Sequence, residues 1–174
     1  MEGIKLNPGE LAPEFSLPDL DGSSRGLSDF RGRITVINFW SAECPWSERV
    51  DGALRQHLAR WADQVNYVTI ACNKNEPRKL LRAEAKRRGL GLVLHDAEQQ
   101  VADSFGARTT PHIFVLDAEG VLRYRGAFDN VTFRQRTPTL EYLPAVVDAL
   151  LAGEEPPWSE TPTFGCTIVH YVGD

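Results

Sequence analysis

The residues best suited to chemistry lie in the stretch SAECPWSERV, residues 41 to 50. It contains Cys44, followed by Pro45 and Trp46, and Ser47 stands where a Cys-x-x-Cys redox motif carries its second thiol. A cysteine thiolate is a nucleophile that attacks disulfides and peroxides, and its product must then be resolved. Ser47 cannot resolve it as a cysteine would. The stretch therefore leaves three alternatives: chemistry with one thiol, a second thiol from elsewhere in the chain, or lost activity.

The other cysteines and the histidines suggest no metal site. Cys72 and Cys166 complete an odd, widely spaced set that is not a disulfide framework, and no cysteine or histidine pair has metal-ligand spacing. We expect no metal and no cofactor. Cys72 ends a predicted buried strand, so we interpret it as a packing residue. The four histidines are scattered, and we place none of them in the site.

The elements around Cys44 indicate how it would be activated. ITVINFW, residues 34–40, is a continuous apolar run typical of a strand buried on both faces, and residues 45–61 have helical periodicity. Cys44 thus lies between a buried strand and a helix. Unpaired N–H groups and the helix dipole favour a thiolate there, and the Ser47 hydroxyl could also donate to the sulfur. The Glu43 carboxylate opposes this effect. We expect a lowered Cys44 pKa.

The rest of the chain predicts an α/β sandwich with a mixed sheet. Residues 1–33 suggest a lead-in with a small hairpin, and the tail includes a candidate edge strand at 166–172. We interpret residues 1–152 as one domain and 153–174 as a tail packed on it. The other expected elements are strands at 65–72 and 91–96, helices at 76–89, 98–106 and 139–154, and a hairpin of 112–117 with 121–126. Pro144 predicts a kink or a late start in the last helix.

Composition excludes several functional classes. The chain has 174 residues, 42% hydrophobic, which fits one domain, and its net charge of −5 gives no reason to expect nucleic-acid or anionic-membrane binding. We interpret the basic cluster between Lys74 and Arg88 as a solvated helix face. No apolar run reaches the ~20 residues of a membrane span, and the start does not resemble a signal peptide. The expected location is the cytoplasm, or the periplasm if the natural chain is longer.

Two signatures resemble the thioredoxin-like superfamily. ITVINFWSAECPWS resembles its strand-to-helix active site, and RTTPHIFVLDAEGVLRYRG resembles its second signature, in which a Thr-Pro pair faces the cysteine before a final hairpin. The resemblance implies a three-layer sandwich with helices on both faces of the sheet. It also implies a cis peptide between Thr110 and Pro111. The backbone of Thr110 would then bind an incoming peptide or disulfide as an added strand.

Further segments resemble one branch of that superfamily. LAPEFSLPDLDG and GLVLHDAEQQVADSFGART are similar to the redoxin branch that includes alkyl hydroperoxide reductase, thiol-specific antioxidant proteins and membrane-anchored thiol reductases. The resemblance covers about residues 9 to 151. The tail TPTFGCTIVHY resembles the end of a redoxin subgroup with a single Cys-Pro and a Gly-Cys-x-Ile near the C-terminus. In that subgroup the pair would be Cys44 and Cys166.

Several positions near Cys44 differ from the patterns of peroxiredoxins and thioredoxins. Peroxiredoxins carry Pro-x-x-x-Thr-x-x-Cys, and here Ser41 replaces the threonine while Ile37 occupies the proline position. Arg108 is a candidate for their peroxide-binding arginine only by its place in the sequence. The buried acid that serves thioredoxins as a proton relay corresponds to Asn38, which cannot exchange a proton near neutral pH.

Three hypotheses remain. The first is a thiol-disulfide oxidoreductase in which Cys44 attacks, Cys166 is a candidate resolving thiol, and Pro45, Trp46, Thr110 and Pro111 contact the substrate. The second is a peroxiredoxin-type peroxidase acting on hydroperoxides. The third is a non-catalytic module that binds a partner through the Thr110 backbone. The expected partners are thus protein or small-molecule disulfides and thiols, or hydroperoxides, and no nucleic acid.

Overall fold

The buried strand that precedes Cys44 is the centre of the main sheet. The computed structural model describes residues 6–170, in which every residue of β3 (Ile34–Trp40) is buried. β3 pairs in parallel with β4 (Val65–Ala71) and antiparallel with β7 (His112–Leu116). β5 (Val93–His95) extends the sheet beyond β4, and β8 (Leu122–Gly126) beyond β7, in the order β5-β4-β3-β7-β8. The predicted mixed sheet is confirmed.

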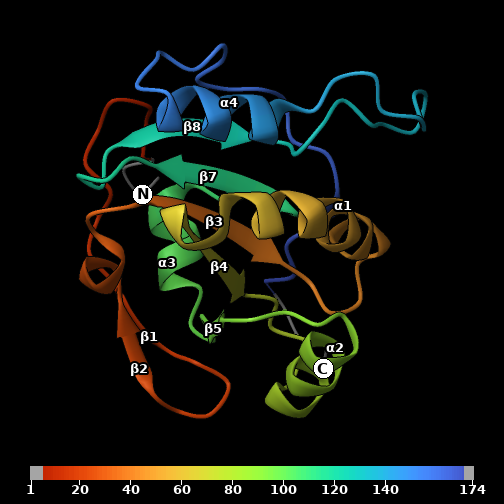
Figure 1. Cartoon of the computed structure of the whole chain (residues 1–174). Helices are drawn as coiled ribbons and strands as arrows, with labels where there is room; N and C mark the ends of the chain where they lie inside the picture. Colours follow the sequence, from red (N-terminus) through yellow and green to blue (C-terminus); the bar gives the residue numbers. More distant parts are fainter. Residues whose placement is uncertain (1–5, 171–174) are drawn as a thin grey trace.

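The helices cover both faces of this sheet, as expected for a three-layer sandwich. Alternation along β3 directs Val36 into a core with α1 (Pro45–Trp61) and α4 (Tyr142–Leu151), and Ile37 into a core with α3 (Gln100–Phe105). α2 (Arg78–Arg87) packs through Leu81 near the carboxyl end of β3. Figure 1 shows α1 passing across β3 and α4 lying beside β8. Short 3₁₀ turns occupy Leu27–Phe30 (η1) and Ala62–Gln64 (η2).

The peripheral elements agree with the sequence in type but differ in extent. The lead-in contains the expected hairpin, β1 (Ser16–Pro18) with β2 (Ser24–Gly26). The last helix starts late, at Tyr142, because Pro144 then lies in the first turn, where its missing N–H removes no helical bond. The expected tail strand is reduced to β9 (Cys166–Thr167), and it pairs with β6 (Thr109–Thr110) outside the main sheet. Residues 171 and 172 of that expected strand lie outside the described residues.

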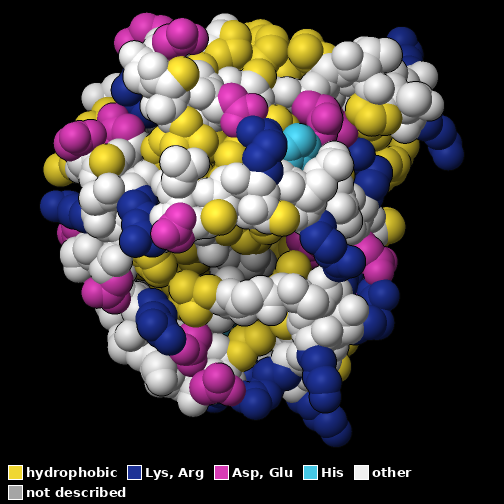
Figure 2. Space-filling view, viewed as in Figure 1, with side chains coloured by type: hydrophobic (Ala, Val, Ile, Leu, Met, Phe, Trp, Pro, Cys, Tyr) yellow, Lys and Arg dark blue, Asp and Glu magenta, His cyan; other side chains and the backbone are white. Residues whose placement is uncertain are grey.

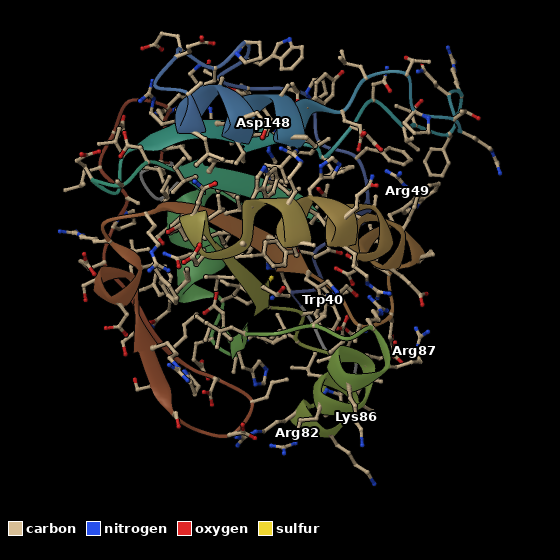
Figure 3. All side chains as sticks on the ribbon, viewed as in Figure 1. Trp40, Arg49, Arg82, Lys86, Arg87 and Asp148 are labelled. Atoms are coloured by element: carbon tan, nitrogen blue, oxygen red, sulfur yellow. The ribbon has the colours of Figure 1, made fainter. Side chains whose placement is uncertain are left out.

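The basic cluster is only partly a solvated face. Figure 2 shows Lys and Arg side chains gathered over α2, and Figure 3 shows Arg82, Lys86 and Arg87 there. Arg87 is exposed and pairs with Glu48 and Glu84. Arg88, however, is only 7% exposed, so the interpretation of this residue as solvated is wrong. Among residues 6–170, no helix is both long enough and apolar enough to cross a membrane.

Candidate active site

Cys44 lies at the carboxyl end of the central strand, where the sequence places it. It is the N-cap of α1, with Pro45 as the first helical residue, and it is only 2% exposed. Ser47 is fully buried one turn later, but its Oγ accepts a hydrogen bond from the Ser41 N–H at 3.3 Å. Its backbone N–H, rather than its hydroxyl, stabilises the Cys44 sulfur. The expected contact between the helix start and the thiol is therefore made by the main chain.

Thr110 and Pro111 lie against this thiol. The peptide bond between them is cis, as the resemblance implies, and the protonated Cys44 Sγ donates to the Thr110 carbonyl oxygen at 3.1 Å. The Thr110 hydroxyl is buried without a hydrogen-bond partner among the described residues, and Thr110 contributes to the lowering of the Cys44 pKa. His112 lies two residues further along, buried, with its Nδ1 accepting from the Arg108 N–H at 3.1 Å.

The tail brings Cys166 to the same place. β9 pairs antiparallel with β6, with Cys166 opposite Thr110 in the register. The Cys44 and Cys166 sulfur atoms are 2.6 Å apart, although the two residues are separated by 122 positions in the chain. A disulfide requires the two Cα atoms to lie within about 7 Å. The pairing of β9 with β6 holds the tail where the two sulfur atoms meet.

The two thiols differ in acidity. Burial raises the pKa of Cys44, but hydrogen bonds from the Cys166 thiol and from the Ser47 and Cys166 backbone outweigh it, so the net pKa is lowered. Burial raises the pKa of Cys166 to about 12, reinforced by its hydrogen bond to Cys44, by the Cys44 charge and by Glu76. Of the two thiols, Cys44 has the lower pKa and is the candidate for the one that ionises first.

A second set of buried charges holds the loop that precedes Cys44. Glu76, only 3% exposed, accepts from the Ser41 hydroxyl at 2.5 Å, from the Ala42 N–H at 2.7 Å and from Asn73 Nδ2 at 2.8 Å. Arg88 donates to the Ser41 and Ala42 carbonyls from the other side. The loop is thus fixed through both its donors and its acceptors.

Arg88 is itself held by a buried carboxylate. Asp51 accepts from Arg88 Nη1 at 3.2 Å and from Trp40 Nε1 at 2.7 Å, and the Arg88 guanidinium lies over the Trp40 ring. Burial raises the pKa of Asp51, although hydrogen bonds from Trp40 and Arg88 offset part of that rise. Sequence reasoning missed Glu76, Arg88 and Asp51, because a charged residue within a charged segment gives no signal that it is buried.

Trp46 contacts the tail and a long loop. Its ring centroid lies 4.7 Å from that of Phe164 and 5.6 Å from that of Phe133, and the two phenylalanines are 4.9 Å apart. Phe133 belongs to the loop between β8 and α4, which Arg49 fixes through two hydrogen bonds to Asp129 of 2.9 and 2.8 Å. Figure 3 labels Arg49 on α1. We call Trp46, Phe133 and Phe164 the aromatic trio.

The remaining candidates lie outside this cluster. Asn38 is fully buried and donates to the Tyr67 hydroxyl at 3.1 Å. Cys72 is 1% exposed, and burial together with nearby carboxylates raises its pKa. Arg108 is exposed and lines an open cavity of about 450 Å³ beside His112 and residues 160–163, not the Cys44 side. Within the described part of the chain, no cluster of metal-ligating side chains occurs.

Comparisons with known proteins identify the family of this chain. The sequence model of the AhpC/TSA family matches residues 8–125. The chain belongs to the AhpC/TSA family. It is 30% identical over 116 residues to the thiol-disulfide oxidoreductase ResA of Geobacillus thermodenitrificans, covering 66% of each chain. It is 28% identical over 132 residues to the peroxiredoxin Bcp of Escherichia coli, covering 68% of this chain and 84% of that protein.

At least two solved structures match nearly the whole chain, with TM-scores of 0.87 and 0.88. A hypothetical protein from Sinorhizobium meliloti 1021 superimposes with a TM-score of 0.87 and 31% identity, covering 98% of both chains. This likeness therefore includes most of the tail. The chain spans only about two thirds of the ResA relative, 66%. The thioredoxin-like fold is thus shown, and the relatives bear the names of thiol redox proteins.

Proposed function

We propose that this protein is a thiol redox enzyme that cycles between a Cys44–Cys166 dithiol and the corresponding disulfide. The observation that carries the proposal is the 2.6 Å separation of the two sulfur atoms together with their opposite pKa shifts. Cys44, whose pKa is lowered, supplies the attacking thiolate. Cys166, whose pKa is raised, keeps its proton until it attacks the oxidised Cys44. Ser47 positions the nucleophile through its backbone. Thr110 and Pro111 form the wall opposite the thiol.

With a disulfide substrate, the Cys44 thiolate attacks one sulfur and the other leaves as a thiolate. Cys166 then loses its proton, attacks Cys44 in the mixed disulfide, and releases the second half of the substrate as a thiol. The products are one Cys44–Cys166 disulfide and two substrate thiols. An external thiol reductant returns the enzyme to the dithiol. This is the thiol-disulfide oxidoreductase activity, and the ResA relative supports it.

A hydroperoxide is the second candidate substrate, supported by the relative named a peroxiredoxin. Here the Cys44 thiolate takes the terminal oxygen, the O–O bond breaks, and the alcohol or water leaves with a proton from solvent. The Cys44 sulfenic acid then condenses with the Cys166 thiol, giving the same disulfide and one water. The non-catalytic hypothesis receives less support, because a pure binding module has no need of a second thiol at contact distance from Cys44.

Disulfide mapping tests the cycle, with Cys72 as an internal control. The reduced protein is treated with one equivalent of hydrogen peroxide or of a small disulfide, alkylated, digested and analysed by mass spectrometry. We expect a peptide linked through Cys44 and Cys166, with Cys72 alkylated. In Cys166→Ser, we expect a Cys44 sulfenic acid or mixed disulfide to accumulate. A link through Cys72, or no linked peptide, would contradict the proposal.

A further inference from the structure

The tail occupies the place where a peptide substrate would pair with Thr110. β9 forms an antiparallel ladder with β6, and the Ile168 N–H continues it to the Arg108 carbonyl at 3.3 Å. In the thioredoxin-like arrangement that the sequence resembles, an added strand at this edge is the incoming substrate. Here the added strand is the chain's own segment 166–168, and Cys44 beneath it is 2% exposed.

The tail approaches the active site too closely for a second strand to fit between them. A Cβ atom on Gly165 would lie 2.2 Å from the Thr110 carbonyl oxygen and 2.8 Å from the carbonyl carbon. Gly126 of β8 meets the tail in the same way, since a Cβ there would lie 2.2 Å from Thr161 Oγ1. Glycine at both positions permits this backbone contact.

Both sides of Cys166 are anchored. After it, Ile168 is buried in the core on the α3 face, and Val169 donates to Asn73 Oδ1 at 2.8 Å. The Val169 carbonyl accepts from the Lys74 N–H at 3.0 Å and from Gln99 Nε2 at 2.8 Å. Before Cys166, Phe164 packs in the aromatic trio. An extended peptide must break these contacts before it reaches Thr110.

We infer that the docked tail limits Cys44 to small oxidants, and that disulfides carried on folded or extended polypeptides are excluded because the tail takes their strand position. This inference rests on the proposed function and names its substrate class. A hydroperoxide or a small disulfide needs only a path to the Cys44 sulfur. A polypeptide disulfide needs the Thr110 edge as well, and that edge is occupied.

The methyl group added by a Gly165→Ala substitution tests this inference. Gly165→Ala forces β9 away from Thr110, whereas Gly91→Ala, with nothing within 4 Å of its added Cβ, is the matched control. Each substitution is made separately in the Cys166→Ser variant, so that the sulfenic acid or mixed disulfide formed on Cys44 is not resolved. Stopped-flow and mass spectrometry measure the rate of Cys44 oxidation by hydrogen peroxide and of mixed-disulfide formation with a peptide closed by one disulfide.

We expect Gly165→Ala to raise the ratio of the peptide rate to the peroxide rate at least tenfold, because loss of the Cys166 backbone hydrogen bond to Cys44 affects both reactions alike, while Gly91→Ala changes neither rate. Ile168→Ala, which removes the buried side chain that anchors the tail after Cys166, is the second opening variant should Gly165→Ala not fold, and the same increase is expected. Equal ratios in the opened and control proteins would overturn the inference and leave the proposed function standing. Failure of Cys44 to react with either oxidant would instead overturn the proposed function.

Discussion

Replacing Cys166 with alanine should raise the pKa of Cys44. The Cys166 thiol is the leading hydrogen-bond donor that stabilises the Cys44 thiolate, at a sulfur–sulfur distance of 2.6 Å, and burial opposes ionisation throughout. A hydrogen bond to a charged group contributes about 1.5–3 kcal/mol in proteins. Because about 1.4 kcal/mol corresponds to a tenfold change in an equilibrium constant, the thiolate fraction of Cys44 below its pKa should fall by about ten- to hundredfold.

The pH dependence of alkylation measures this shift. The second-order rate of the reaction with iodoacetamide follows the thiolate fraction, and peptide analysis separates Cys44 from Cys72, whose pKa is raised by burial and which should react little in the folded protein. Ser47→Ala is the control, because the Ser47 backbone N–H that stabilises the sulfur is retained. An unchanged or lower Cys44 pKa in Cys166→Ala would refute the assignment of Cys44 as nucleophile and Cys166 as proton holder.

Three further predictions concern buried ionisable residues. Arg88→Met leaves the Asp51 carboxylate buried without its cation, so urea unfolding should show a loss of about 3–5 kcal/mol, whereas Arg87→Met at the exposed neighbouring position should change stability far less. Glu76→Gln keeps the size of the side chain but removes one acceptor of the loop clamp and a charge that raises the pKa of the resolving thiol. Peroxide-driven disulfide formation should become faster at pH 8, and an unchanged or slower rate argues against this electrostatic role. Burial, together with nearby arginines, lowers the pKa of His112 to about 3. Between pH 6.5 and 3 the unfolded state therefore binds the proton and the folded state does not, so stability falls as pH falls, by up to about 1.4 kcal/mol per pH unit for this group. Urea unfolding measured from pH 4 to 7 should show that the free energy of unfolding changes less steeply with pH in His112→Leu than in the wild type. Equal slopes would contradict the lowered pKa of His112.

Local patterns determined most of the fold. The continuous apolar run of β3 and the helical spacing after Cys44 placed the thiol at a strand-to-helix junction, and the structure has it there. The late start of α4 also follows from Pro144. The extent of β9 did not follow, because two residues that pair with an isolated edge segment have no periodicity to detect.

The buried charges around Cys44 were beyond sequence reasoning for a physical reason. Arg88 follows a run of exposed basic residues on α2, and its own type and spacing do not distinguish it from Arg87. Its burial depends on Asp51, a residue of α1, and on the carbonyls of the loop before Cys44. These partners come together only when α1 and α2 pack at the same end of the sheet.

The sequence by itself predicted a redox-type site at Cys44 and determined that Ser47 cannot complete a dithiol. It offered Cys166 as a partner only through a resemblance, because chain separation says nothing about distance. Only the tertiary structure places the two cysteines together. β9 pairs with β6, and Gly165 and Gly126 let the tail approach the backbone of the site and of β8. Cys166 thereby reaches Cys44 across 122 positions of the chain. Such a contact depends on the free energy of packing the whole tail, which no local pattern of residue types records.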